Sequence, residues 1–280
     1  MKWIYIKSGF LCVLLISFLP IPSSVSLADS NPLSTVANYK IYYDSPTTQI
    51  LLEMKEYDLV IIEPTLYSGE QIDSIQQSGT KVYGYINTME ADVWNTEITK
   101  KLQPDDYFYR ANKRVYYEKW DSYLMDLTSS HYRSILLQHI KSHIVQKGLD
   151  GVFLDTVGNI DTEHSSTPDI WKDQVDGMLS LLKQIKEQHP NLSLIQNFGL
   201  ETFQKHTHFY MDAIMWEDFH YSVVSKDQWS NNQIASLQSL QQNNHYVVLT
   251  VSFSEKKKSS NYAARHKFIH FHTSNGFNKW

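Results

Sequence analysis

The sequence contains a single cysteine, Cys12, which lies inside an apolar run close to the N-terminus. A lipid-modified cysteine follows such a run, so this position does not suit that role. Since no cysteine comes later, the rest of the chain has no disulfide bond and must depend on its own hydrophobic core. The roughly 250 residues that remain are enough to bury a core and match the usual size of a single α/β barrel.

Long apolar runs are also missing, apart from residues 9–21. The cationic residues 1–7 precede this run, and the small residues Ser26 and Ala28 follow it at alternate positions, as in a secretory signal peptide. The run is shorter than the ~20 residues that a membrane-spanning helix needs. We therefore predict a signal peptide over residues 1–28, secretion, and no stable membrane anchor. A retained N-terminal anchor is the alternative.

Basic residues are in the minority. Removing Lys2 and Lys7 from the 25 basic residues leaves 23 against 30 acidic ones, so the formal charge falls from −5 to −7. The longest basic tract, three lysines at 256–258, is expected in a solvated loop, and nucleic acid is not the expected partner. An acidic surface suits a cationic substrate. Low-complexity linkers and internal repeats are absent, which predicts one domain over residues 29–280.

Short runs rich in Val, Ile, Tyr and Phe alternate with longer stretches that carry helical spacing or many helix formers, from about residue 40 onward. This alternation is typical of βα units that form a parallel sheet. Eight such runs match the strand number of a (β/α)8 barrel of the TIM type, so we predict the α/β class with this barrel. The runs are residues 40–43, 59–62, 81–86, 151–154, 193–196, 213–216, 246–251 and 267–271.

Helical spacing of apolar residues predicts three longer helices. Residues 130–147 show a buried stripe that ends at Gly148, and residues 170–188 repeat the pattern before Pro190 ends it. Residues 225–242 show a weaker pattern. Because the chain ends soon after the eighth apolar run, the last helix of the barrel is expected to be short or absent. An open doubly wound sheet is the alternative fold.

Acidic and amide side chains close several of the predicted strands. In barrels of this class the active groups come from the carboxyl ends of the strands. A carboxylate at such a position can instead cap the following helix, which is the simpler explanation for any single one. Several at one rim are harder to explain in that way. The residues are Asp44, Glu63, Glu90, Asp155, Asn197 and Glu217.

Asp155 and Glu217 are the two carboxylates that most directly follow buried strands. They close the fourth and sixth strands, so both side chains can lean over the same mouth of the barrel. Glycoside hydrolysis needs two carboxyl groups in different protonation states. Tyr85 and Trp216 are expected at the same rim, where aromatic faces stack on sugar rings, although aromatic residues are more often part of a core.

Five short segments occur in order along the chain: residues 57–63, 79–90, 148–155, 196–197 and 216–217. Together they resemble the endo-α-1,4-polygalactosaminidase family, glycoside hydrolase family 114, over most of the chain. The resemblance implies a barrel enzyme that acts on an extracellular polysaccharide rich in α-1,4-linked galactosamine. It also implies hydrolysis with retention of configuration and without a metal or organic cofactor.

Carried over by position, the resemblance implies that Asp155 is the nucleophile and Glu217 the general acid and base. Glu90 and Asn197 fall where the family places further rim residues, which implies substrate binding. The full set of expected substrate-binding residues is Asp44, Glu63, Tyr85, Glu90, Asn197 and Trp216.

The sequence departs from the family pattern at three places. Met89 precedes Glu90 where a small residue is usual, and Gly158 replaces an acid expected shortly after Asp155. In the seventh strand, Ser252 stands in the stretch where the family commonly has an Asp-Tyr pair. These changes retain the proposed catalytic pair and leave the identity of the sugar open.

Two other functions stay open. The twelve histidines raise the question of a metal-dependent polysaccharide deacetylase, since His139 and His143 lie four residues apart on a predicted helix. No acid lies between them, and His270 and His272 of the last strand lack an evident third ligand, so no metal site is predicted. A non-catalytic carbohydrate-binding barrel is the second alternative. A Gly-x-Ser-x-Gly motif is absent, which disfavours a serine nucleophile.

Overall fold

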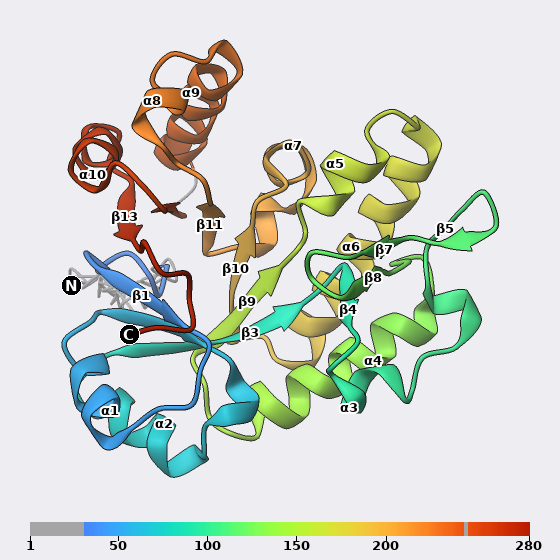
Figure 1. Cartoon of the computed structure of the whole chain (residues 1–280), viewed down its shortest axis with the longest axis horizontal. Coiled ribbons are helices and arrows are strands. Elements are labelled where there is room, and N and C mark those ends of the chain that lie inside the picture. The colour runs from blue at the N-terminus through green and yellow to red at the C-terminus, as the bar shows by residue number, and fades with distance from the viewer. Residues whose placement is uncertain (1–30, 244–245) are drawn as a thin grey trace, which may run out of the picture. The chain divides into compact units, whose positions relative to one another are not determined.

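The computed structural model describes residues 31–243 and 246–280, and the predicted signal peptide over residues 1–28 lies outside them. Within the described residues, eight parallel strands form one sheet in the order β1, β2, β3, β9, β10, β11, β12, β13, and the last lies beside the first (Figure 1). This nearly closed barrel confirms the predicted fold. The strands are β1 (Tyr39–Tyr42), β2 (Leu59–Ile62), β3 (Lys81–Asn87), β9 (Gly151–Asp155), β10 (Ser193–Asn197), β11 (Ala213–Trp216), β12 (Val247–Ser252) and β13 (Ile269–His272).

The barrel strands have both faces covered, as expected for a parallel sheet surrounded by helices. Successive side chains point alternately into the barrel and outward to the helices. In β9, Phe153 packs inside the barrel, whereas Val152 and Leu154 pack in the core outside it. In β11, the same alternation places Met215 inside and Trp216 outside.

Helices cover the outside of the barrel (Figure 1). The helix predicted over residues 130–147 is α4, continued by the π-helical turn η3 (Lys141–Val145). The helices predicted over residues 170–188 and 225–242 correspond to α6 and α9. The longer helices are α1 (Thr48–Met54), α2 (Gly69–Gln76), α4 (Ser130–Ile140), α6 (Pro168–Gln188), α9 (Gln228–Asn243) and α10 (Lys256–Arg265).

Residues 256–258 begin helix α10 and do not form the expected loop. Lysine is a good helix former, and these three lysines are exposed while Ser259 and Ala263 of the same helix are buried. In residues 273–280, which the structure describes, no helix follows β13. The shorter helical elements are η1 (Pro64–Leu66), α5 (Asn159–His164), α7 (Leu200–Thr202), η4 (Phe203–Thr207), η5 (His208–Tyr210) and α8 (Tyr221–Val224).

An insertion, residues 88–129, separates β3 from α4 at the carboxyl end of the barrel. Sequence periodicity did not predict its short strands. The backbone N–H of Met125 donates to the carbonyl of Met89 at 2.8 Å, which joins the two ends of the insertion. Its strands β4, β8 and β7 pair antiparallel, and β5 pairs with β6. The elements are β4 (Glu90–Asp92), α3 (Thr96–Thr99), η2 (Pro104–Asp106), β5 (Tyr109–Arg110), β6 (Lys113–Arg114), β7 (Tyr116–Tyr117) and β8 (Ser122–Leu124).

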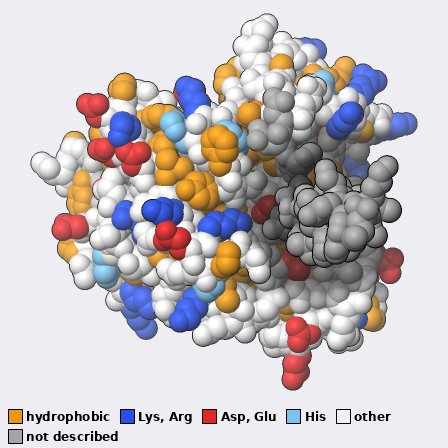
Figure 2. All heavy atoms as spheres, turned by 180° about the vertical axis from the view of Figure 1, so that it is seen from behind, with side chains coloured by type: hydrophobic (Ala, Val, Ile, Leu, Met, Phe, Trp, Pro, Cys, Tyr) orange, Lys and Arg blue, Asp and Glu red, His pale blue; other side chains and the backbone are white. Residues whose placement is uncertain are grey.

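The C-terminal segment crosses back to the first strand (Figure 1). The N–H of Tyr43 donates to the carbonyl of Phe277 at 2.8 Å, and the rings of Tyr42 and Trp280 meet edge-on at 5.5 Å. On the face shown in Figure 2, Lys and Arg side chains are interspersed with acidic and apolar ones. Among the described residues, no helix has both the length and the apolar character needed to cross a membrane.

Candidate active site

Three neighbouring strands deliver the predicted catalytic residues to one place. Asp155 ends β9, Asn197 ends β10, and Glu217 directly follows β11. The Nδ2 of Asn197 donates to the Oδ1 of Asp155 at 2.6 Å and to the Oε1 of Glu217 at 3.0 Å. A single amide group therefore holds the two carboxylates side by side.

The backbone turns sharply after each of these residues. Thr156, Phe198 and Asp218 have φ angles of 60°, 55° and 54°, in the left-handed region that costs non-glycine residues roughly 1 kcal/mol. Backbone hydrogen bonds stabilise two of these turns. The N–H of Phe198 donates to the carbonyl of Met215 at 2.9 Å, and the N–H of Phe219 donates to the carbonyl of Val251 at 2.8 Å. The turns end each strand and leave the side chain before them at the rim.

Asp155 is surrounded by groups that stabilise its ionised form. Its carboxylate accepts hydrogen bonds from Asn197 at 2.6 Å and from the backbone N–H of Thr156 at 2.7 Å, and the hydroxyl of Tyr85 also favours its ionised form. Burial raises the pKa of Asp155, and the interactions with Asn197, Thr156 and Tyr85 offset only part of this rise. The result is a buried carboxylate that is well supplied with donors.

Glu217 has a different environment. Burial first, and then the negative charge of Asp155, raise the pKa of Glu217 to about 8, while the hydrogen bond from Asn197 opposes this rise. Among the described residues Asn197 is the one whose side chain donates to its carboxylate. This raised pKa favours the protonated form of Glu217 at neutral pH.

Two tyrosines stand beside Asp155. The rings of Tyr43 and Tyr85 lie 4.9 Å apart, and Tyr85 also packs on Phe153 inside the barrel. Burial and the nearby carboxylates raise the pKa of both tyrosines well above the ordinary value, so both hydroxyls keep their protons. Tyr85 therefore lies close to Asp155, and its hydroxyl lowers the pKa of that carboxylate.

Glu90 lies on β4 of the insertion and is almost fully buried. It accepts hydrogen bonds from the hydroxyl of Ser122 and, at 2.7 Å, from the Nδ2 of Asn159. Burial raises the pKa of Glu90, and the charge of Asp155 adds to the effect. Glu90 borders the same cavity as Tyr85 and Asn87.

Asp92 and Asn87 belong to the same group of residues but were not predicted. Asn87 ends β3 in register with Asp155; its Oδ1 accepts from Thr156 Oγ1 at 2.7 Å and its Nδ2 donates to Asp92 at 3.2 Å. Burial raises the pKa of Asp92 to about 6. The position of Asn87 at the end of an apolar run was a usable signal, whereas Asp92 follows a strand that the periodicity did not reveal.

A cavity lies between the third strand, the insertion and α4. Glu63 accepts from the N–H and hydroxyl of Thr65, so it caps η1, and its pKa is raised by burial. It nevertheless borders this cavity. The lining includes Glu63, Tyr85, Asn87, Glu90, Asp92 and Trp94.

Trp216 and Asp44 occupy other positions. Trp216 is only 3% exposed, and its ring packs against Phe219 and Trp229 outside the barrel. It cannot stack on a sugar there, because strand alternation directs it into the core, so its expected binding role does not fit this structure. Asp44 is exposed beyond β1 and accepts from the N–H of Ser45.

The departures from the family pattern have local causes. A side chain at Gly158 would meet Phe198 at 3.1 Å, so an acid does not fit without movement. Asp161 instead accepts hydrogen bonds from the backbone of α7. On β12, the hydroxyl of Ser252 is within 3.0 Å of ring nitrogens of His270 and His272, so polar groups replace the acid at that part of the rim.

Comparison with known proteins gives a consistent result. The glycoside hydrolase domain of PelA from Pseudomonas aeruginosa has a similar structure, with a TM-score of 0.70, 18% identity and coverage of 87% of this chain and 97% of that one. Aspergillus fumigatus Ega3 in complex with galactosamine gives a TM-score of 0.65 at 15% identity, covering 87% and 93%. The maltogenic α-amylase AmyB from Thermotoga neapolitana gives 0.57 at 13% identity, covering 88% and 68%.

These likenesses establish the fold. No curated protein sequence matches the chain. The sequence profile of glycoside-hydrolase family GH114, in contrast, matches residues 24–280. The match includes the barrel and every residue of the site described above, and the chain therefore belongs to glycoside-hydrolase family GH114 and is a glycoside hydrolase.

Proposed function

We propose that the protein is a secreted glycoside hydrolase that cleaves a polysaccharide containing α-1,4-linked galactosamine with retention of configuration. The proposal rests above all on the Asn197 amide, which donates to both Asp155 and Glu217. Asp155 is the nucleophile and Glu217 the general acid and base.

The protonation states suit these roles. Asp155 is the better stabilised anion, and Glu217 holds the proton of the pair at neutral pH. Asp155 attacks the anomeric carbon while Glu217 gives its proton to the leaving glycosidic oxygen, which forms a covalent glycosyl-enzyme. Glu217, now ionised, takes a proton from water as that water displaces Asp155 from the sugar.

The spacing of the two carboxylates supports retention. Both acceptor oxygens contact the same nitrogen, at 2.6 and 3.0 Å, so their separation cannot exceed the sum of these distances. Retaining enzymes have carboxyl groups about 5–5.5 Å apart, whereas inverting enzymes need about 6.5 Å or more to admit a water molecule. The bound given by Asn197 agrees with the retaining class.

The acidic lining of the cavity supports the proposed substrate class. Glu63, Glu90 and Asp92 border the cavity next to Tyr85, and they favour a sugar with a cationic amino group. Trp94 borders the same cavity and is 61% exposed, so its face is available to a sugar ring. The structural likeness to Ega3 in complex with galactosamine points to the same sugar.

The test is reducing-end release from a galactosamine polymer by the wild type and by Asp155→Asn and Glu217→Gln. We expect each substitution to lower kcat at least about 10³-fold. Asp218→Asn is the matched control, because Asp218 is exposed and follows Glu217 directly; this variant should keep most of the activity. Proton NMR of the first products should show the anomeric configuration of the substrate.

Other outcomes identify the alternatives. A wild type that binds the polymer and cleaves none of the tested polysaccharides would support a carbohydrate-binding barrel, and acetate release without chain cleavage would support a deacetylase. N-terminal sequencing of the exported protein tests secretion and should begin at Asp29. A sequence beginning at Met1 would favour a retained anchor.

A further inference from the structure

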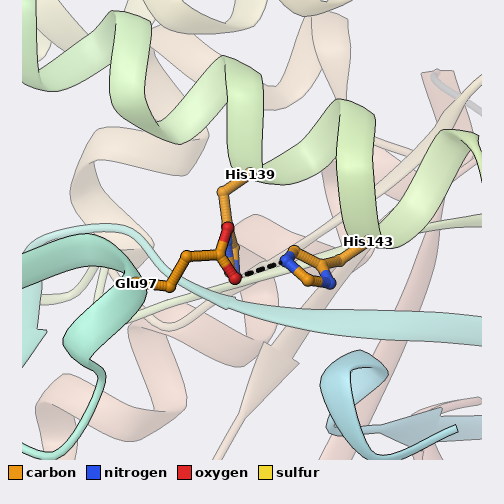
Figure 3. Close-up of side chains that lie close together, drawn as sticks. All are labelled: Glu97, His139 and His143. Atoms are coloured by element: carbon orange, nitrogen blue, oxygen red, sulfur yellow. Dashed lines mark hydrogen bonds and ion pairs between the residues drawn. The ribbon is translucent and has the colours of Figure 1, made fainter. Parts of the chain in front are cut away.

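Two histidines of one helix face a glutamate of the insertion (Figure 3). His139 lies on α4 and His143 on η3, four residues further along the same face of the helix. Glu97 comes from α3, 46 residues before His143. The sequence indicated the two histidines as a pair but could not indicate the acid, which tertiary folding brings to them.

The three side chains converge on one point. Glu97 Oε2 lies 2.8 Å from His143 Nε2, and Glu97 Oε1 lies 3.6 Å from His139 Nδ1. One ligand atom from each residue lies within 4.8 Å of the others. Tetrahedral zinc holds nitrogen and oxygen ligands at about 2.0–2.2 Å, which places neighbouring ligand atoms about 3.4 Å apart. Small side-chain rotations reach that geometry.

The buried histidine has a nitrogen that needs a partner. His139 is 6% exposed, and its Nδ1, the atom that faces Glu97, has no hydrogen-bond partner among the described residues. Leaving a buried polar atom without a partner costs about 1–3 kcal/mol. Glu97 is exposed, and its carboxylate contacts His143 at 2.8 Å through Oε2 and Lys101 at 3.6 Å through Oε1, so neither oxygen bonds this nitrogen.

The helix itself is irregular at this point. The backbone changes from α-helical to π-helical geometry between His139 and His143. Such turns are rare and are often found at functional sites. The same helix carries another histidine–carboxylate contact, in which Nδ1 of His131 lies 2.7 Å from Oδ2 of Asp106. Only one imidazole takes part in that contact. At Glu97, in contrast, one carboxylate faces two imidazoles, those of His139 and His143, whose ring centroids lie 4.4 Å apart.

We propose that Glu97, His139 and His143 bind a divalent transition metal, with zinc as the best match to two imidazoles and one carboxylate. Three protein ligands leave one position for water. The ion fastens α3 of the insertion to α4. It is separate from the proposed nucleophile and acid, and the inference does not depend on the proposed function.

The position of the ion gives it a consequence for the active site. His139 borders the same cavity as Glu90, Asp92 and Trp94. Asn95 and Ile98, on either side of Glu97, border it too. An ion bound here therefore restricts the motion of the segment around Glu97, which forms one wall of the cavity. Because it binds the folded state, it also stabilises the protein by mass action.

Tag-free protein, treated with a chelator and dialysed, is titrated with zinc chloride by calorimetry, and its thermal unfolding is followed with and without zinc. We expect one zinc ion per chain and a higher Tm when zinc is present. Glu97→Gln and His143→Gln each remove one ligand from a position that is not fully buried. Each should weaken binding by more than the roughly 10- to 100-fold that loss of an outer-shell partner costs.

His131→Gln is the matched control, because it removes the other histidine–carboxylate contact of α4 and should leave zinc affinity unchanged. Circular dichroism of each variant without zinc confirms that the fold is kept. The proposal is overturned when the wild type binds no zinc, or when Glu97→Gln and His143→Gln bind it as tightly as the control. If one variant fails to fold, the zinc affinity of the other variant tests the proposal. If both fail to fold, the zinc titration of the wild type tests it.

Discussion

Asn197 contacts both carboxylates of the pair, so it influences the protonation of each. Its hydrogen bonds favour the ionised forms and lower the pKa of Asp155 and of Glu217. Removal of this amide therefore raises both pKa values. The proposed mechanism needs Asp155 ionised and Glu217 protonated, so Asn197 helps to set the pH range of activity.

Asn197→Ala is expected to move both limbs of the pH profile to higher pH. The acid limb follows ionisation of Asp155 and the alkaline limb follows loss of the proton from Glu217, which lies at about pH 8 in the wild type. We expect a lower maximum, by about 10²-fold, because the carboxylates are also less well positioned. Measurement of kcat/KM against pH checks this, and a lower rate with unmoved limbs would contradict it.

Glu217→Gln is expected to stabilise the protein at alkaline pH. The folded-state pKa of Glu217, about 8, lies above its ordinary value of 4.5, so the folded protein binds a proton that the unfolded chain has lost. The wild type therefore loses stability as the pH rises between these values. The uncharged glutamine has no such loss, which gives a gain on the order of 2 kcal/mol at pH 9.

Urea unfolding at pH 5 and pH 9 tests this prediction. The difference between Glu217→Gln and the wild type should be larger at pH 9. Asp218→Asn removes a neighbouring exposed carboxylate whose charge is the smallest contribution to the raised pKa of Glu217, so its increase should be much smaller. Equal differences at the two pH values would argue against a proton held by Glu217.

At the scale of elements, the insertion between β3 and α4 supplies residues that the barrel strands alone do not. Strand β4 carries Glu90 and Asp92, and the segment after it carries Trp94 and Glu97. Its strands are two or three residues long, too short for a periodic pattern to be visible in the sequence. The barrel strands are four to seven residues long with both faces covered, so their apolar runs were visible.

Trp94→Ala is expected to raise the KM for the polymer by about 10-fold, because stacking on a sugar ring contributes about 1 kcal/mol or slightly more. The matched control is Trp120→Ala. Trp120 has a similar exposure, 60%, and lies in the same insertion, but it does not border the cavity. Steady-state kinetics should show the increase for Trp94→Ala alone, and equal effects of the two variants would exclude a specific contact.

At the scale of the whole molecule, the C-terminal segment helps to hold the barrel together where β13 meets β1. These two strands lie side by side but are not hydrogen-bonded in the sheet. Trp280 packs edge-on against Tyr42 and Tyr57 and lies 4.2 Å from the Nζ of Lys40. Its indole N–H donates to Glu53 of α1. The last residue thus connects the end of the chain to its first βα unit.

Trp280→Ala is expected to lower the free energy of unfolding by about 1–2 kcal/mol, through the loss of aromatic packing and of the cation–π contact. Urea unfolding at neutral pH measures the change. Lys279→Ala, at the exposed neighbouring position, should have almost no effect. A wild-type stability for Trp280→Ala would show that the barrel does not depend on this segment.

The sequence by itself determined the α/β barrel, the order of its strands and the positions of Asp155, Asn197 and Glu217 at strand ends. It could do so because the order of strands follows the order of the chain, and because the residue that ends a buried strand must lie at the rim. Local patterns are enough for such statements.

Tertiary structure alone decided what these residues contact. In the folded protein Asn197 donates hydrogen bonds to both carboxylates, and Trp216 is buried in the core. Asp92 borders the cavity, and Glu97 lies next to His139. Each of these depends on the distance between residues that are far apart in the chain or on the face to which a side chain points. Hydrogen bonding and burial act through space, so the pKa of Glu217 and the convergence of ligands on one point arise only in the folded protein.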